Sequence, residues 1–259
     1  NEALNSYFIE EDQIMFEYNN EIQKVELAAW GINAHFYSGI ADHQSESQYL
    51  DSLDFDGDGN YEYKFYNIKT ITDWINDKPH VIYGDIWITN GASLNIGPGS
   101  NIYLHNNSNI IVTESSTLNM NGGQSTDQLI TVQGDRLENY YQDIPGQWGK
   151  IWLTAGSINN KIEYTIIQNG TIGLQIDSVV NENPSLELKN SIINNMSGLG
   201  ILAQGAHVIG ENLLVTNCGQ YGLALNIGGK YDFKHCTFAN YYTSTSRQTP
   251  NLFINNYYE

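Results

Sequence analysis

The sequence is poor in basic residues and in charge of either sign. Its 259 residues contain 11 lysines and arginines against 29 aspartates and glutamates, which gives a formal net charge of −18, and charged residues make up only 15% of the chain. Such an excess of negative charge repels phosphate backbones and anionic lipid headgroups. Since Arg136, Arg247 and nine scattered lysines cannot form a basic stripe, nucleic acid is not an expected partner. The acidic surface is compatible with neutral glycans and with cations.

Long apolar runs are also missing. No stretch reaches the length of a membrane-spanning helix, and no secretory signal opens the chain. We therefore expect no direct membrane insertion of this segment. The composition is globular, with 41% hydrophobic and 12% aromatic residues, and it includes 32 asparagines. Because asparagine competes with helical hydrogen bonding and tolerates left-handed turns, this composition favours turn-rich β structure over helix.

An internal repeat runs through the second half of the chain. Four segments (YTIIQNG, NSIINNM, NLLVTNC and HCTFANY) place an apolar run before an asparagine, with spacings of 26, 22 and 23 residues: Asn169, Asn195, Asn217 and Asn240. The apolar residues form two columns: Ile166, Ile192, Leu214 and Thr237, then Ile167, Ile193, Val215 and Phe238. In three repeats a second short strand follows, with glycine at matching places: Gly173, Gly200 and Gly222. This period suits a parallel β-solenoid, whose coils stack at the ~4.8 Å strand spacing.

The asparagine column has a physical explanation in such a stack. A buried amide at a bend can hydrogen-bond to the same amide one coil above and one coil below. The alternative is four unrelated turn asparagines in an asparagine-rich chain. The matching apolar columns on both sides favour the ladder.

Residues 85–122 continue this architecture upstream. Apolar residues come there as pairs two positions apart, separated by turn residues, which is a period-2 pattern with one face inward. The paired residues are Ile86, Ile88, Leu94, Ile96, Ile102, Leu104, Ile110, Val112, Leu118 and Met120. We expect roughly eight coils from about residue 80 onward, following the logic of stacked repeats.

Three stretches resemble repeats of the right-handed parallel β-helix proteins found on bacterial surfaces: NDKPHVIYGDIWITNGASLNIGPGSNIYLH, GQWGKIWLTAGSINNKIEYTIIQN and CTFANY. That family is mostly of unknown function, and many of its members are surface lipoproteins. The resemblance covers about residues 68–259. It implies an all-β, right-handed parallel β-helix that is extracellular or on the outer cell surface, where a lipid anchor would lie before residue 1.

Residues 1–67 lack the coil period. We expect them to form a small N-terminal β domain or cap, with strands at 12–19, 21–33, 34–39 and 61–68, and residues 68–259 to form the β-helix. A solenoid leaves open strand edges and an open apolar core at each end, so a cover is required. Trp30, Phe36 and Trp74 are candidates for plugging the first coil. The alternative is that they fill only the core of the N-terminal domain.

The stretch DFDGDGN has the spacing of a calcium loop. Asp54, Asp56 and Asp58 stand at positions 1, 3 and 5, with glycine at position 6. Asn60 would offer its carbonyl at position 7 and Glu62 falls at position 9, but phenylalanine takes the place of the bidentate glutamate at position 12. We expect a structural Ca²⁺ that fixes this turn. The alternative is a solvated acidic turn, because Asp-Gly is itself good turn chemistry.

The equipment of a polysaccharide-cleaving enzyme is not visible in the sequence. Lyases need a lysine or arginine beside carboxylates that hold Ca²⁺, and the coil lysines do not fall in one alignment column with acids: Lys150, Lys161, Lys189, Lys230 and Lys234. Hydrolases need two carboxylates facing a cleft, and the coil region offers few acids. The six histidines have no metal-binding spacing, and we expect surface or packing roles for them.

Two insertions carry the candidate binding residues. Those of residues 134–149 are Asp135, Arg136, Glu138, Tyr140, Tyr141 and Asp143, and those of residues 240–251 are Tyr241, Tyr242 and Arg247. Loops on a rigid scaffold often hold binding groups, and aromatic faces beside acids suit a sugar ring. The alternative is that these tyrosines pack back onto the solenoid. Trp148, next to a strand, is expected to be structural.

The two cysteines are predicted to be free thiols. Cys218 follows its ladder asparagine by one position, whereas Cys236 precedes its own by four. In adjacent coils this register separates them by five columns, beyond the ~7 Å Cα limit for a disulfide.

These features predict a non-catalytic cell-surface or secreted β-helix scaffold that binds glycans or other surface partners. The alternative is a polysaccharide lyase or glycoside hydrolase of the pectate-lyase-like β-helix type.

Overall fold

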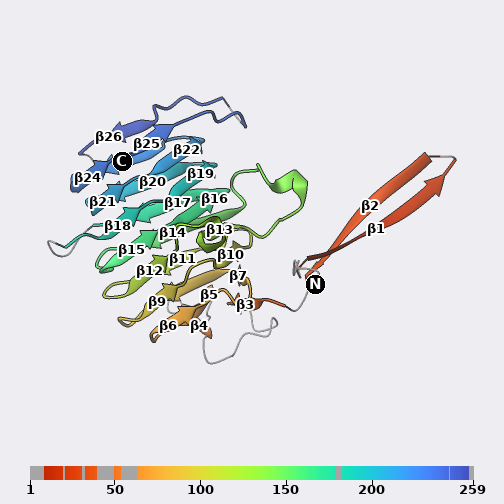
Figure 1. Cartoon of the computed structure of the whole chain (residues 1–259), viewed down its shortest axis with the longest axis horizontal. Helices are drawn as coiled ribbons and strands as arrows, with labels where there is room; N and C mark the ends of the chain where they lie inside the picture. Colours follow the sequence, from red (N-terminus) through yellow and green to blue (C-terminus); the bar gives the residue numbers. More distant parts are fainter. Residues whose placement is uncertain are drawn as a thin grey trace.

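The chain folds as an all-β protein in which parallel sheets build a β-solenoid of about seven turns (Figure 1). The computed structural model describes residues 9–19, 21–30, 33–39, 50–53, 63–178, 183–244 and 246–256. The solenoid that the repeat predicted is confirmed, while its right-handed coil stays a prediction.

Each full turn adds one strand to each of three sheets. Sheet 1 contains β3 (His35–Ser38), β7 (His80–Tyr83), β10 (Asn101–Leu104), β13 (Ile130–Gly134), β16 (Thr165–Gln168), β19 (Ile192–Met196), β22 (Leu214–Cys218) and β25 (Thr237–Ala239). Sheet 2 contains β4 (Leu50–Leu53), β5 (Tyr63–Ile68), β8 (Asp85–Ile88), β11 (Ile110–Val112), β14 (Trp148–Leu153), β17 (Gly170–Ile176), β20 (Leu199–Gln204), β23 (Leu223–Asn226) and β26 (Leu252–Ile254). Sheet 3 contains β6 (Thr72–Trp74), β9 (Ser93–Ile96), β12 (Thr117–Asn121), β15 (Asn160–Glu163), β18 (Leu186–Lys189), β21 (His207–Glu211) and β24 (Lys230–Lys234).

The expected number of coils, roughly eight from repeat logic, is one too many. The turns after residue 80 begin at β7, β10, β13, β16, β19, β22 and β25. The first insertion separates the apolar run of β13 from that of β14. In the sequence these two runs look like separate repeats, although they are successive strands of one turn. The 3₁₀ helix η3 (Asn139–Tyr141) lies in this insertion, and a second, η2 (Thr126–Gln128), precedes β13.

The core runs along the axis of the solenoid as one apolar cluster. All ten paired apolar residues of the 85–122 region are at most 1% exposed, which confirms their inward orientation. Of the two columns in the later repeats, the one with Ile167, Ile193 and Val215 faces inward, whereas Leu214 on the other side of the strand is 37% exposed. This is the expected alternation of a strand.

The asparagine column is confirmed in register, and its members do more than stack. Strand pairing aligns Asn169, Asn195 and Asn217, and all three have left-handed backbones, with φ of 64°, 57° and 55°. Asn195 Nδ2 donates to Asn169 Oδ1 at 2.9 Å, but Asn217 Nδ2 donates to Asn194. The column is therefore a series of left-handed corners joined only in part by amide-to-amide bonds.

A second asparagine column, which the repeat analysis missed, follows the strands of sheet 3. Asn190 and Asn212 also have left-handed backbones. Asn212 Nδ2 donates to Asn190 Oδ1 at 2.9 Å, and Asn190 Nδ2 donates to Glu163. Two of the solenoid's corners are thus built by the same residue type.

The strands near the N-terminus fall into two groups. β1 (Ile9–Tyr18) and β2 (Glu21–Trp30) form a separate antiparallel hairpin that projects from the solenoid in Figure 1. β3 and β5 pair with β7 and β8 of the solenoid, so the sheets begin before residue 68. All four predicted strands are present, and the division at residues 67 and 68 stays a prediction.

The first turn is closed by aromatic side chains. Trp74 is 2% exposed and belongs to the core cluster, which confirms it as part of the plug. Its ring stacks on those of Tyr37 and His80, with centroids 4.5 and 4.6 Å apart. Phe36 lies beside Tyr83, and the side chain of Trp30 lies outside the described part of the structure.

Candidate functional site

Residues 135–147, the part of the first insertion that lies between β13 and β14, are tied to the next turn of the solenoid. Gly146 and Gln147 donate backbone hydrogen bonds to Gly170 and Asn169, at 3.2 and 2.8 Å. The side-chain amide of Asn169 donates to the carbonyl oxygen of Gln142 at 2.9 Å. The ladder asparagine nearest to the insertion therefore also anchors it.

A hollow of about 350 Å³ lies between this insertion and the outer face of sheet 1. Gln133 of β13 and Gln168 of β16 form its floor, and Gln168 Nε2 donates to Gln133 Oε1 at 2.6 Å. The other lining residues are Gly134, Arg136, Leu137, Gln142, Asp143 and Asn169. The lining is therefore dominated by amide and charged groups.

Arg136 is neutralised by a neighbour within the insertion. Its Nη2 lies 2.8 Å from Glu138 Oε1, and its guanidinium lies 3.9 Å from the ring centroid of Tyr141. The hydrogen bond with Arg136 lowers the pKa of the Glu138 carboxyl, and the same pair raises the pKa of Arg136. Asp143 is the remaining charged group of the lining.

The tyrosines of the insertion belong to η3, which directly precedes Gln142 of the lining. Tyr140 is 78% exposed, and its ring meets that of Tyr141 edge-on, with centroids 5.1 Å apart. Trp148, in contrast, is 1% exposed and donates from Nε1 to the carbonyl oxygen of Gln168 at 2.8 Å. The structural role expected for Trp148 is confirmed.

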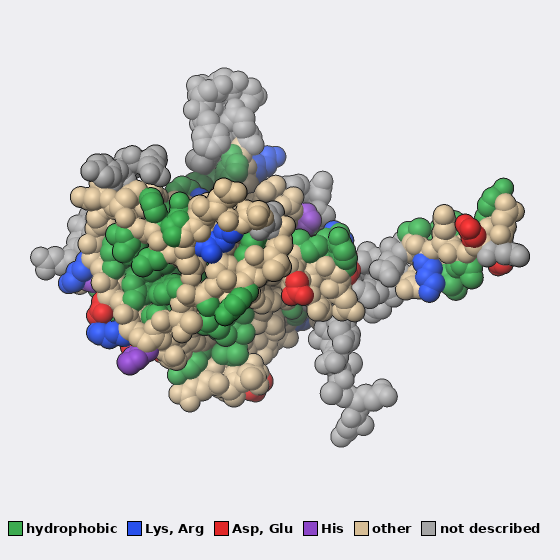
Figure 2. Space-filling model, turned by 90° about the horizontal axis from the view of Figure 1, so that it is seen from above, with side chains coloured by type: hydrophobic (Ala, Val, Ile, Leu, Met, Phe, Trp, Pro, Cys, Tyr) green, Lys and Arg blue, Asp and Glu red, His purple; other side chains and the backbone are tan. Residues whose placement is uncertain are grey.

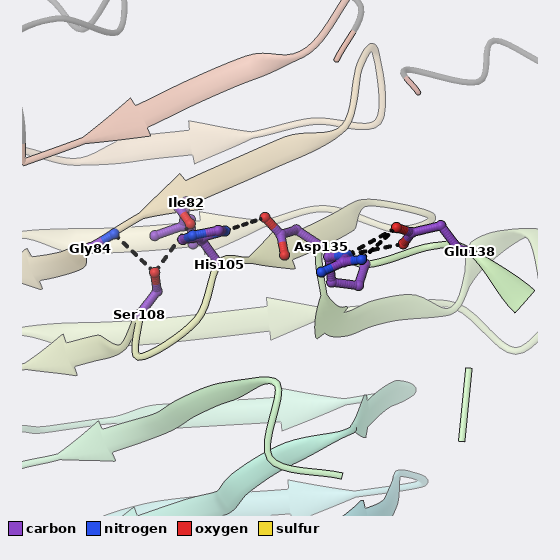
Figure 3. Close-up of polar contacts among 7 residues, drawn as sticks. Ile82, Gly84, His105, Ser108, Asp135 and Glu138 are labelled. Carbon is purple, nitrogen blue, oxygen red and sulfur yellow. Dashed lines mark hydrogen bonds and ion pairs between the residues drawn. The ribbon is translucent and has the colours of Figure 1, made fainter. Parts of the chain in front are cut away.

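Asp135 turns to a histidine of the preceding turn, as Figure 3 shows. His105 Nδ1 donates to Asp135 Oδ2 at 2.7 Å, and the ring of His105 stacks on that of Tyr83 with centroids 4.7 Å apart. The side chain of Asp135 is 3% exposed and that of His105 is 48% exposed. Burial raises the pKa of the Asp135 carboxyl, and the hydrogen bond from His105 opposes this. The buried carboxylate thus orients an imidazole that is about half exposed.

The second insertion folds back onto the turn that precedes it. Arg247 Nε and Thr249 Oγ1 both donate to the carbonyl oxygen of Gln220, at 2.8 and 2.7 Å. Tyr241 is 79% exposed, whereas Tyr242 is half-buried. Only Tyr241 presents a fully accessible ring here.

The structure places the two insertions at one corner of the solenoid without joining them into one site. Both connect a strand of sheet 1 to a strand of sheet 2, β13 to β14 and β25 to β26. Four strand steps separate β13 from β25, which corresponds to about 19 Å along the axis. Of the candidates from residues 134–149, Arg136 and Asp143 line the hollow, while Tyr241, Tyr242 and Arg247 lie farther along the same corner.

The expectation that no coil lysine shares a column with acids is wrong. Strand pairing in sheet 3 aligns Glu163, Lys189, Glu211 and Lys234 in one column, and Lys189 Nζ lies 3.8 Å from Glu211 Oε2. These strands have no apolar outer column that would reveal their register in the sequence. Lys189 and Glu211 form an exposed ion pair, whereas Lys234 pairs with Asp232 at 2.8 Å.

The candidate calcium ligands, Asp54, Asp56, Asp58, Asn60 and Glu62, lie outside the described residues. The flanking strands β4 and β5 pair antiparallel, with Leu53 opposite Tyr63. Within the described part of the chain, no group of three or more His, Cys, Asp or Glu side chains could hold a metal ion. No helix of that part is long and apolar enough to cross a membrane.

The predicted thiol state is confirmed. Cys218 and Cys236 are free, and Cys218 is buried. The pairing of Val215 with Phe238 sets the five-column offset between the two cysteines.

Comparison with known proteins gives no relative. No family model matches the chain, no curated protein matches it, and no solved structure matches it. Function is therefore argued from the geometry.

Sequence reasoning missed the floor of the hollow and the partner of Asp135. Gln133 and Gln168 do leave a signal, because each ends a short apolar run, in ITVQG and TIIQN, and the two runs align in adjacent turns. His105 leaves no such signal in the sequence, because its contact with Asp135 forms only when adjacent turns of the solenoid stack on each other.

Proposed function

We propose that this protein is a non-catalytic scaffold, displayed on the outer cell surface or secreted, that binds a neutral glycan in the hollow beside the first insertion. The observation that carries the proposal is the lining itself. Gln133, Gln168 and Asn169 offer amide groups, Asp143 offers an acceptor, and the exposed Tyr140 lies two residues before Gln142 of the lining. Amides and carboxylates pair with sugar hydroxyls, and aromatic faces suit the apolar faces of sugar rings.

Charge favours a neutral ligand over an acidic one. The chain carries a net charge of −18, and Arg136, the cation of the lining, is paired with Glu138 at 2.8 Å. A polyanion would meet long-range repulsion and would have to break that pair. Nucleic acid is disfavoured for the same reason.

Affinity electrophoresis tests the proposal. The protein is run through gels that contain plant, algal or host polysaccharides, and the gels are then stained for depolymerisation. We expect one or more neutral glycans to retard the protein without cleared zones. Gln168→Ala should lose the retardation, and Glu187→Gln, on the outer side of sheet 3, should keep it. Equal retardation of both variants would place binding elsewhere.

A second candidate function is acid–base cleavage of a glycan, and the buried Asp135 that orients His105 favours it. An imidazole held by a carboxylate can act as a general base. Cleared zones that disappear in His105→Asn and persist in His235→Asn would establish this activity. His235 is a suitable control because its left-handed backbone accepts asparagine.

A structural Ca²⁺ at Asp54, Asp56, Asp58, Asn60 and Glu62 is also proposed, on the spacing of these oxygen ligands. Its removal should lower the melting temperature, because a ligand that binds only the folded state stabilises it. The measurement is thermal unfolding in Ca²⁺ and in chelator, with Asp56→Asn as the variant that should no longer respond. Identical melting temperatures of the unaltered protein in both conditions would rule the ion out.

A further inference from the structure

The floor of the hollow ends in a hydrogen-bond acceptor. Gln133 Oε1 accepts from Gln168 Nε2 at 2.6 Å. Burial raises the pKa of Tyr103, and the hydrogen bond from the Gln133 side chain opposes this, so the Gln133 amide is engaged at both ends. Among the described residues, no donor reaches Gln168 Oε1. The two glutamines thus form a directed chain whose free end accepts.

A second acceptor, buried and unpartnered, lies beside the lining. Gln147 Nε2 donates to the carbonyl oxygens of Tyr141 and Ile144, at 2.6 and 2.7 Å, which fixes the orientation of this amide. Its Oε1 is buried and has no hydrogen-bond partner in the described part of the chain. This oxygen occupies the space that a Cβ on Gly134 would need, and Gly134 lines the hollow. Because a buried acceptor without a donor costs free energy, a ligand that donates here is favoured.

The lining also carries an uncompensated negative charge. Arg136 is held by Glu138, whose Oε1 accepts from Nε at 3.0 Å and from Nη2 at 2.8 Å. The Asp143 carboxylate forms no ion pair with the residues that the structure describes. Gln142 Nε2 donates to Asn139 Oδ1 at 3.1 Å, which leaves Oε1 as the free end of that amide. Figure 2 shows the lysine and arginine side chains of the face that it views scattered and not gathered into a patch.

We propose that the hollow prefers a glycan with a primary ammonium group, so that an amino sugar binds more tightly than the same sugar with a hydroxyl group in that place. This inference rests on the proposed function and narrows its ligand to one class of non-acidic glycan. An ammonium group has three donors and no acceptor, whereas a hydroxyl group has one donor and two acceptor lone pairs. The ammonium group therefore matches a lining whose free groups accept, and it neutralises Asp143.

Titration calorimetry with three probes tests this inference. The probes are cello-, chitosan and chitin oligosaccharides of equal length, which share one backbone and linkage and carry a hydroxyl, ammonium or acetamide group at the same carbon. At a pH that keeps the amine protonated, the chitosan oligosaccharide should bind about tenfold more tightly than the cello-oligosaccharide, because hydrogen bonds to charged groups are the stronger ones. The chitin oligosaccharide, which lacks the charge, should show no such advantage.

Two variants separate a contact in the hollow from the general attraction of a cation to an acidic protein. Asp143→Asn should bring the affinities for the chitosan and cello-oligosaccharides together. Glu187→Gln is the matched control, since it removes the same charge on the outer side of sheet 3, and it should keep the preference. Equal affinities in the unaltered protein, a preference that Asp143→Asn retains, or an equal loss in both variants would each overturn the inference, the last by assigning it to long-range attraction.

Failure of this inference is distinguishable from failure of the proposed function. If the chitosan and cello-oligosaccharides bind equally and Gln168→Ala weakens both, the glycan site stands and the selection of an ammonium group falls. If Gln168→Ala changes neither affinity, the hollow is not the site and both proposals fall. Absence of binding by all three probes would overturn the inference, and retardation by another glycan in affinity electrophoresis would still support the glycan site.

Discussion

Asn169 supports the solenoid and the proposed binding site together. Its backbone is left-handed, with φ of 64°, its Oδ1 accepts from Asn195, and its Nδ2 donates to the carbonyl oxygen of Gln142. Asn169→Ala should destabilise the protein by about 2–3 kcal/mol, because it removes both bonds and places a Cβ-bearing residue without local hydrogen bonding at positive φ. Asn169→Gly should cost about 1 kcal/mol less, since glycine accepts this backbone. Urea unfolding measures both values, and a larger loss for the glycine variant would contradict the role of the backbone.

His80 makes the N-terminal plug sensitive to acid. It is 2% exposed, its Nδ1 accepts from Tyr37 Oη at 2.9 Å, and its Nε2 donates to the carbonyl oxygen of Ile75 at 3.1 Å. Burial lowers the pKa of His80 from 6.5 to about 4. Because the folded pKa lies below the unfolded one, the stabilisation is present above pH 6.5 and is lost as the pH falls towards 4.

We expect this one group to remove about 2 kcal/mol of stability between neutral pH and about pH 5. Thermal unfolding across that range measures the loss. His80→Gln should be less stable at neutral pH but should show a shallower dependence on pH. An equally steep dependence in His80→Gln would assign the effect to other groups.

Single residues were predictable where their chemistry is local. The buried Trp148 follows from its position beside one strand, and the two free cysteines follow from their offsets to the asparagines of two adjacent turns. The contact between His105 and Asp135 could not be predicted, because it depends on the stacking of corners 30 residues apart.

At the scale of strands, the glycine column sets how closely the inner face of sheet 2 approaches sheet 1. A Cβ on Gly200 would lie 2.5 Å from Val215 Cγ1 and 2.6 Å from the backbone oxygen of Gly222. Because the backbone oxygen cannot move aside, Gly200→Ala should cost about 1–3 kcal/mol by overpacking. Gly97→Ala, whose Cβ would meet nothing closer than 3.4 Å, is the control. Equal free energies of unfolding for Gly200→Ala and Gly97→Ala in urea would show that the turns can move apart to accept the added Cβ.

Strands were predictable where one face is apolar. The inner columns of sheets 1 and 2 gave the register of Ile167 with Ile193 and of Gly173 with Gly200, and pairing confirms both. The later strands of sheet 3 carry charged residues such as Lys189 and Glu211 on their outer face. Because this outer face has no repeated apolar pattern, the alignment of the sheet 3 lysines with acids could not be predicted.

At the scale of the whole molecule, the solenoid is a regular stack of turns, and the two insertions interrupt it between sheet 1 and sheet 2. In the next turn, Asn169 alone connects β16 to β17 at this corner, without an insertion. Strand pairing aligns both Gly134 and Gln147 with Asn169. A variant that lacks residues 135–147 should therefore form a turn like the next one. The hollow was not predictable from sequence, because its floor and its wall are brought together only by the stacking of turns.

The most direct test of the proposed glycan site compares the unaltered protein with this deletion variant. The measurement is the dissociation constant for the glycan that retards the unaltered protein, determined by titration calorimetry, with a cooperative melting transition as proof that the variant is folded. We predict that the dissociation constant of the variant is at least tenfold larger, which corresponds to a loss of about 1.4 kcal/mol of binding free energy. An unchanged dissociation constant in the folded variant would show that the hollow beside the first insertion is not the binding site.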